Sequence, residues 1–213
     1  MKSTYKTTKA PTIIFRFASI YNQQWKNVYD YKMKKGEVFP YKFPSNDQIK
    51  EYIEKIKPFW RKIEEKVLSE MAEVIGFGWD DVKITCYVVG GGTIPFSEPL
   101  TVPVYKQYPN YFIDMLTHEL IHQLFNQATN EEKTKKIGKL MDERYPNKTA
   151  STKIHIPILA VHTHLYKKII GEDRLKINIR EFQNLPDYKA AWDTVQKESY
   201  EKIIWDINYT LGM

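Results

Sequence analysis

The chain is organised around one stretch of sequence, Leu116-Thr117-His118-Glu119-Leu120-Ile121-His122-Gln123-Leu124-Phe125. Apolar residues surround most of the circumference of the helix expected here, which indicates a helix of the core. Residues four apart stand on one helix face, so His118 and His122 can present two imidazoles to a single metal ion. Glu119 follows His118 directly on this helix and lies within reach of a water held by that ion. Burying these polar side chains is costly unless a partner such as a metal satisfies them.

Two histidines do not complete a catalytic zinc site, which usually has three protein ligands and a position for water. The other histidines are His155, His162 and His164, in or just before a helix expected over 157–171. His162 shares a face with apolar residues of that helix and is the expected third ligand. His155 shares that face only if the helix begins before Pro157, and His164 is rotated from His162 by about 200° towards lysines. A carboxylate ligand stays open as well, from Glu131, Glu132, Asp142 or Glu143.

Residues 115–124 resemble the active-site helix of the zincin metallopeptidases. In that family uncharged residues surround His-Glu-x-x-His and a hydrophobic residue follows it, as in this chain. The resemblance implies that His118 and His122 bind one Zn²⁺ ion and that Glu119 is the general base. Metzincins continue with Gly and His, whereas this chain has Phe125 and Ala128, so the pattern is closer to the gluzincins. The downstream Glu-x-x-x-Asp helix of the gluzincins is not evident.

The expected function is therefore hydrolysis of a peptide or protein substrate by a zinc-activated water. His155 or Tyr166 could donate a hydrogen bond to the carbonyl oxygen of the substrate. Asp114 and Asn126, one turn either side of the ligand pair, could orient an imidazole or could face solvent. Two alternatives stay open: a zincin fold that binds without turnover, and a non-peptidase hydrolase with the same metal centre. Glu119 favours catalysis, because a structural metal site needs no base.

The remaining patterns predict one α+β domain over 1–213, with a loose tail at 1–10 and a helical extension at 172–213. We expect a small twisted, zincin-like sheet with an edge strand, packed on a long backing helix and a buried active-site helix, followed by a mainly helical C-terminal half. Expected strands cover 12–20 and 82–88. Residues 100–105 are expected to form an edge strand or an irregular segment beside one, because Pro99 and Pro103 weaken a ladder. Expected helices cover 46–76, 130–145, 157–171 and 186–209. The first of them starts at a Ser45–Gln48 capping box and is interrupted at Pro58. Residues 21–44 and 146–153 are expected to be irregular.

Composition excludes several classes of function. The charge of +6 over 213 residues is modest, and no basic stripe or nucleic-acid-binding module is present, so we expect no nucleic-acid partner. Cys86 is the only cysteine, which excludes an internal disulfide and a cysteine-based zinc site. Gly90-Gly91-Gly92 lacks the Lys-Ser/Thr of a phosphate-binding loop and predicts a turn. We expect no signal peptide and no membrane partner, hence a cytoplasmic protein, and the sequence does not predict an oligomeric state.

Overall fold

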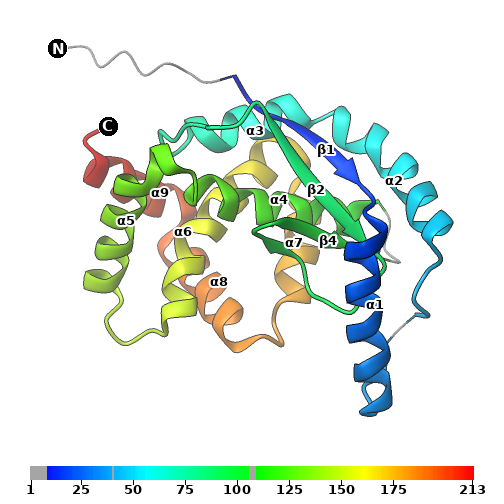
Figure 1. Ribbon diagram of the computed structural model, residues 1–213. Coiled ribbons are helices and arrows are strands. Elements are labelled where there is room, and N and C mark those ends of the chain that lie inside the picture. The colour runs from blue at the N-terminus through cyan, green and yellow to red at the C-terminus, as the bar shows by residue number, and fades with distance from the viewer. Residues whose placement is uncertain (1–8, 40, 106–108) are drawn as a thin grey trace. The chain divides into compact units, whose positions relative to one another are not determined.

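The computed structural model describes residues 9–39, 41–105 and 109–213, and its architecture is α+β, as predicted (Figure 1). The chain divides into two units. The β unit comprises residues 11–65 and 83–123, and the helical unit comprises the described residues 9–10, 66–82 and 124–213. The single domain stays a prediction, and the first eight residues of the predicted tail lie outside the described residues.

The β unit contains a four-stranded mixed sheet in the order β1-β2-β4-β3, of which Figure 1 labels β1, β2 and β4. β1 (Thr12–Arg16) and β4 (Leu100–Pro103) both run parallel to the central β2 (Lys83–Val89). β3 (Phe96–Ser97) pairs antiparallel with β4. The two predicted strands before residue 90 therefore form and pair with each other.

The register of β1 and β2 brings apolar side chains together on buried positions. Burial alternates along β1, so that Ile13 and Phe15 are buried and their neighbours are exposed. Ile13 lies opposite Ile84, and Phe15 lies opposite Cys86. Cys86 is fully buried, and burial raises the pKa of its thiol. A thiol that stays protonated in this way is a packing residue and not a nucleophile.

The position of β4 corrects one prediction, because residues 100–103 are not an edge strand. β4 lies between β2 and β3 in the sheet. Pro103 is tolerated there because β3 pairs only with Leu100 and Thr101, so the missing N–H falls beyond the β3 ladder. The edges of the sheet are β1 and the two-residue β3.

The outer edge of β1 is closed by charged side chains. The N–H of Ile13 donates to Oε1 of Glu64 at 2.7 Å, and Nη2 of Arg61 donates to the carbonyl of Ile13 at 2.8 Å. Arg61 and Glu64 also form an ion pair with each other, and Nε1 of Trp60 donates to Oε1 of Glu64 at 2.9 Å. Because these bonds occupy the free backbone groups of Ile13, this edge is protected from pairing with another strand.

The predicted backing helix is two helices, α2 (Asn46–Arg61) and α3 (Glu64–Glu73). α2 begins with the predicted capping box, in which Oγ of Ser45 accepts the Gln48 N–H at 3.3 Å and Oε1 of Gln48 accepts the Ser45 N–H at 2.8 Å. Pro58 lies inside α2, and the helix ends one turn later. The predicted interruption is therefore confirmed, although the break falls after the proline and not at it.

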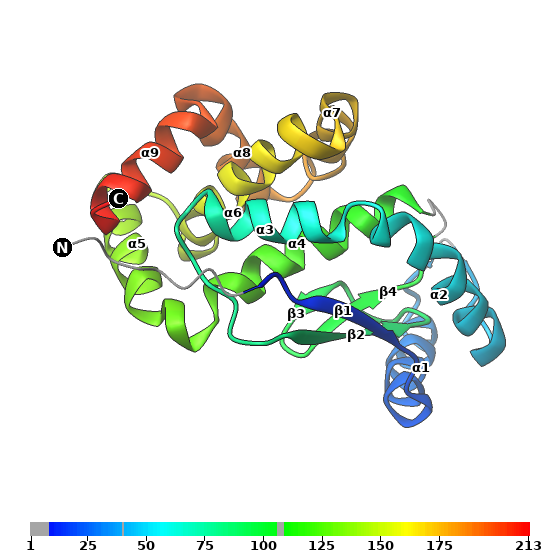
Figure 2. The same cartoon turned by 90° about the horizontal axis from the view of Figure 1, so that it is seen from above.

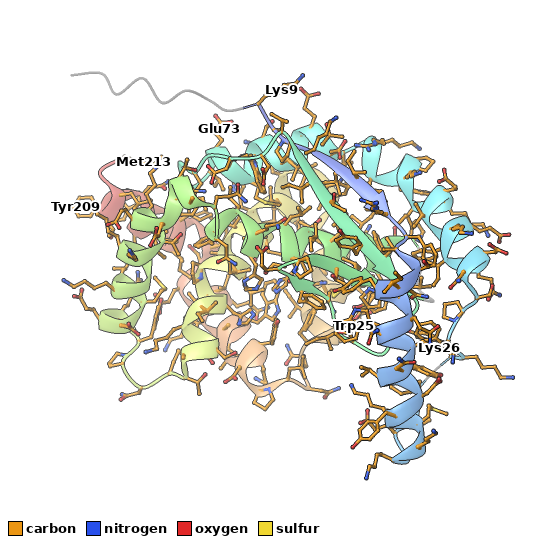
Figure 3. All side chains as sticks on the ribbon, viewed as in Figure 1. Lys9, Trp25, Lys26, Glu73, Tyr209 and Met213 are labelled. Atoms are coloured by element: carbon orange, nitrogen blue, oxygen red, sulfur yellow. The ribbon has the colours of Figure 1, made fainter. Side chains whose placement is uncertain are left out.

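α1 (Ser19–Lys34) replaces the irregular segment expected after residue 20. Its aromatic side chains pack on the sheet: Tyr21 contacts Tyr87 of β2 with ring centroids 5.2 Å apart, and Trp25 contacts Phe96 of β3 at 5.7 Å. Figure 3 shows Trp25 on the side of α1 towards the strands. Tertiary packing of aromatic rings thus forms a helix that lacks a clear apolar period.

The glycine run after β2 allows close packing. A Cβ atom at Gly92 would lie 2.3 Å from the backbone oxygen of Trp25, and one at Gly90 would lie 2.5 Å from the ring of Phe43. Gly92 also has a φ of +81°, which other residues rarely adopt. The predicted turn is confirmed.

The helical unit consists of α-helices with one π-helical turn and one 3-10 helix, η1 (Ala128–Asn130). Its main elements are α5 (Glu131–Arg144), α6 (Ala150–Leu165), the π-helix η2 (Tyr166–Ile170), α7 (Glu172–Glu181), α8 (Pro186–Glu198) and α9 (Tyr200–Leu211). α6 packs against α5, α8 and α9 (Figure 2). The predicted final helix is broken into α8 and α9 at Ser199, which has a φ of +67° and caps α9. No helix among the described residues combines the length and apolar character needed to cross a membrane.

Candidate metal centre

α4 (Asn110–Phe125) carries the histidine pair and is buried, as its composition predicts. Every residue from Phe112 to Ile121 is buried, including Asp114, His118 and Glu119. A buried helix restrains its side chains to few rotamers, so polar groups on it hold defined positions.

His118 and His122 turn their imidazoles towards each other. Their Nε2 atoms are 3.2 Å apart, and their ring centroids are 4.8 Å apart with the planes at 70°. Two nitrogens bound to zinc at 2.0–2.1 Å in a tetrahedron are separated by about 3.3 Å. The pair is therefore spaced as two corners of a zinc coordination tetrahedron. The same separation also allows the two rings to share a proton.

Glu119 is the buried acid beside this pair. Burial raises the pKa of Glu119 to about 8, because the charged form loses solvation. A cation bound nearby would favour the carboxylate and oppose that shift. A metal cation would thus compensate the negative charge of the buried Glu119 carboxylate.

Tyr105, two residues after the end of β4, is a neighbour of Glu119 that the sequence reasoning missed. Burial raises the pKa of Tyr105, and the charges of Tyr111 and Glu119 raise it further. The rings of Tyr105 and Tyr111 meet edge to face, with centroids 4.5 Å apart. The only sequence signal was the position of Tyr105, between the last strand and the His-bearing helix.

The two residues considered as orienting partners differ in burial. Asp114 is buried in α4, one turn before His118, so it does not face solvent. Asn126 follows the end of α4 and is exposed. Of the two, only Asp114 is placed in the interior with the histidines.

α6 begins at Ala150, seven residues before the predicted start at Pro157. Thr149 caps it, because Oγ1 of Thr149 accepts the Thr152 N–H at 3.1 Å. Pro157 lies within this helix. The helix forms although Pro157 has no N–H and so cannot donate a backbone hydrogen bond. His155 is therefore helical and shares a face with His162, the condition under which the sequence left His155 open as a ligand.

His155 is held with one ring nitrogen occupied. Its Nδ1 donates to the backbone carbonyl of Ser151 at 2.7 Å, which leaves the lone pair on Nε2. The ring of Tyr188 lies against it, with centroids 4.1 Å apart. Burial lowers the pKa of His155, so the ring stays neutral, which is the form that binds metals.

His162 has the surroundings of a core residue. It is fully buried, stacks on Tyr166 with centroids 4.3 Å apart, and meets Trp192 edge to face at 5.8 Å. Burial lowers the pKa of His162 to about 3, and the charge of Arg174 lowers it further. Tyr166, considered as an oxyanion donor, is itself fully buried in this stack.

The other considered ligands have partners of their own. Nε2 of His164 lies 2.7 Å from Oε1 of Glu70, which Lys168 also contacts at 2.7 Å. The four carboxylates lie in exposed ion pairs of α5: Glu131 and Glu132 with Lys135, Asp142 with Lys153, and Glu143 with Lys139. His118 and His122 belong to the β unit and His155 to the helical unit. Imidazole is a ligand that suits zinc, so the His118–His122 pair supplies two of the donors of a zinc site.

Comparison of the chain with protein family models, curated proteins and solved structures found no match. The resemblance of residues 115–124 to the zincins stays a prediction. An inference about function therefore depends on the geometry of the side chains.

Proposed function

We propose that this protein is a zinc-dependent metallopeptidase in which His118 and His122 hold one Zn²⁺ ion and Glu119 is the general base. The observation that carries the proposal is the 3.2 Å separation of the two Nε2 atoms on the helix that bears Glu119. A third protein ligand beside this pair would leave one coordination position for water, which distinguishes a catalytic zinc site from a structural one.

A bound zinc ion would polarise a water molecule and the scissile carbonyl of the substrate. Glu119 accepts a proton from the water as its oxygen attacks the carbonyl carbon. The C–N bond then breaks, and Glu119 gives the same proton to the leaving nitrogen. The base returns to its carboxylate form, and one water has been added across the peptide bond. The hydroxyl of Tyr105 is a candidate donor to the carbonyl oxygen.

The sheet supports an extended peptide as substrate. The outer edge of β1 is closed at Ile13 by Arg61 and Glu64, and the other edge of the sheet is the two-residue β3, which we propose as the strand that a substrate pairs with. Backbone hydrogen bonds to a sheet edge recognise an extended peptide without strong dependence on its sequence.

Metal content of the purified chain tests the site. We expect close to one zinc per chain in wild type, and loss of it in His118→Ala and His122→Ala. His164→Ala is the matched control and should keep zinc, because His164 pairs with Glu70. A wild-type protein purified without chelator that neither contains zinc nor takes it up would overturn the proposal.

Glu119→Gln separates catalysis from metal binding. This variant should keep its zinc, and its hydrolysis of a diverse peptide mixture should fall by about 10²–10⁴-fold, because the amide cannot accept the proton. Glu131→Gln, the same change on an exposed helix, serves as control. An unchanged rate in Glu119→Gln would remove Glu119 from the mechanism. Zinc binding without hydrolysis by wild type would favour the binding-protein alternative.

A further inference from the structure

The sheet of the β unit has an inner and an outer face. Ile13 and Phe15 of β1 are buried on the inner face, where Phe15 contacts Phe112 of α4 with ring centroids 5.8 Å apart. Successive side chains of a strand point to opposite faces, so the residues beside Ile13 and Phe15 lie on the outer face. The register adds their neighbours on β2. The outer-face residues of these two strands are Thr12, Ile14, Arg16, Lys83, Thr85 and Tyr87.

α1 covers only part of this outer face. Tyr21 contacts Tyr87 in the second half of β2, and its hydroxyl oxygen lies 3.0 Å from Oγ1 of Thr101 on β4. Trp25 contacts Phe96 of β3. In Figure 2, α1 and α4 lie on opposite sides of the sheet. α1 therefore covers β3, β4 and the second half of β2, and leaves β1 and the first half of β2 exposed on the outer side.

We call the uncovered part the open face: Thr12, Ile14, Arg16, Lys83 and Thr85. It carries two cations and no acidic residue, and the first turn of α1, which follows β1, has no acidic residue either. Neither Arg16 nor Lys83 has an ion-pair partner among the described residues. Lys83 lies beside Thr12, so the two cations stand about 13 Å apart along the strands. Ile14, a side chain with 38% of its surface exposed, lies between them.

We propose that the open face binds an acidic segment of another protein, with carboxylates on Arg16 and Lys83 and an apolar side chain on Ile14. Two carboxylates four residues apart in an extended segment are separated by about 13 Å, which matches the spacing of the two cations. This inference goes beyond the zinc site and does not depend on it. Every contact that carries it lies within the β unit.

The chemistry of the open face favours a protein over a nucleic acid or a second copy of this chain. Single-stranded nucleic acids are bound by a charged groove that follows the backbone and by aromatic rings on which bases stack. The open face has two separate cations, and Tyr21 covers the ring of Tyr87. A two-fold contact of the open face with itself would bring like charges together, which opposes association.

NMR titration of the full-length, isotope-labelled chain tests the proposal with a defined probe, the peptide Ser-Gly-Glu-Thr-Val-Thr-Glu-Gly-Ser. Its two glutamates are four residues apart and flank a valine. We expect changes in amide chemical shift that are centred on residues 12–16 and 83–87. The Kd should rise as salt is raised from about 50 to about 300 mM, because exposed charges are screened. Replacing both glutamates of the peptide with glutamine should weaken binding by about 10-fold or more, a test that leaves the protein unchanged.

Charge reversal on the protein tests the two cations separately. Arg16→Glu and Lys83→Glu should each weaken binding of the peptide by about 5-fold, because an attraction becomes a repulsion. Lys34→Glu is the matched control, since Lys34 is an exposed lysine at the far end of α1, about 22 Å from its start. It should bind the peptide within about twofold of wild type, because that distance exceeds the screening length. Far-UV circular dichroism confirms that each variant is folded.

Several results would overturn the proposal. These are the absence of shift changes at millimolar peptide, shift changes centred away from the open face, and equal affinity in Arg16→Glu, Lys83→Glu and Lys34→Glu. A single-stranded DNA of mixed sequence that binds more tightly than the peptide, and loses affinity in the same variants, would assign the face to nucleic acid instead. Light scattering that shows a dimer, dissociated by Arg16→Glu, would assign it to a second copy.

Discussion

At the scale of single residues, the histidines differ in what their rings contact and not in their chemistry. His118 and His122 face each other across 3.2 Å, whereas His162 is sealed among aromatic rings and His164 pairs with Glu70. A helical spacing of four was sufficient to predict the first pair, because that relation is local. No local pattern ranks the remaining histidines, because their environments come from residues distant in sequence, such as Glu70, Tyr188 and Trp192.

His162 makes the stability of the metal-free protein depend on pH. The pKa of His162 in the folded state, about 3, lies below the unfolded value of about 6.5, so the unfolded chain binds the proton first. The contribution of neutral His162 to the free energy of unfolding is therefore complete above pH 6.5 and is lost as pH falls towards 3. The slope contributed by His162 is at most about 1.4 kcal/mol per pH unit.

Denaturant unfolding in the presence of chelator, between pH 7 and pH 5, measures this slope. His162→Leu should flatten it, since leucine takes up no proton. His164→Leu, which changes a histidine with an ion-pair partner, controls for the substitution. An equal slope in wild type and His162→Leu would contradict the expectation.

At the scale of elements, sequence patterns among neighbouring residues predicted helix starts correctly. Helix starts that depend on tertiary packing were not predicted. The capping box at Ser45 and Gln48 formed as predicted, because both partners lie within one turn. α6 instead begins at Ala150, well before Pro157. Thr149 caps its first turn and also donates a hydrogen bond to Asp187, and both contacts stabilise this early start. α1 formed where no apolar period was visible, because its aromatic residues pack on strands far along the chain.

Glu64 is expected to be one of the most sensitive positions of the β unit. Glu64→Ala leaves the donors of Ile13, Trp60 and Arg61 without their acceptor, and should lower the free energy of unfolding by about 3–5 kcal/mol. Urea unfolding measures this. Glu65→Ala changes the adjacent, exposed acid and should stay within about 0.5 kcal/mol of wild type. Equal effects of the two variants would rule out the edge-closing role.

The close approach of α1 to the glycine run makes Gly92 a second sensitive position. Gly92→Ala should cost at least about 2 kcal/mol of unfolding free energy, because a Cβ would meet the Trp25 backbone and φ is positive. Gly138→Ala provides a control of opposite sign: nothing lies within 4 Å of its Cβ position in α5, so it should stabilise by about 0.5–1 kcal/mol. Thermal unfolding of both variants checks the pair, and a neutral Gly92→Ala would show that α1 can shift.

At the scale of the whole molecule, each unit contains fully buried apolar residues that need no metal. Ile13, Ile84 and Val88 are buried in the β unit, and Ile158 and Trp192 in the helical unit. Small zinc domains without such cores unfold when the metal is removed. This chain is expected to stay folded without zinc, and the proposed ion then adds stability only through binding.

Metal removal should therefore lower thermal stability without unfolding the chain. Zinc at about 100 times its dissociation constant adds about 2.7 kcal/mol, which raises Tm by roughly 5–10 °C for a chain of this size. The far-UV circular dichroism of the chelated protein at 20 °C should match that of the zinc-loaded protein. His118→Ala should show no zinc-dependent rise in Tm. Loss of helical signal on chelation would instead indicate a structural metal.

Some properties of this protein follow from local chemistry in the chain: the α+β class, the buried helix with its His118–His122 pair, the capping box and the glycine turn. Each depends on residues within a few turns of one another, so spacing alone predicts them. Others required the tertiary structure: the place of β4 inside the sheet, the early start of α6, the packing of α1 and the surroundings of His155 and His162. These depend on contacts between residues far apart in sequence, whose free energy outweighs the weaker local preferences of proline and of an irregular apolar pattern.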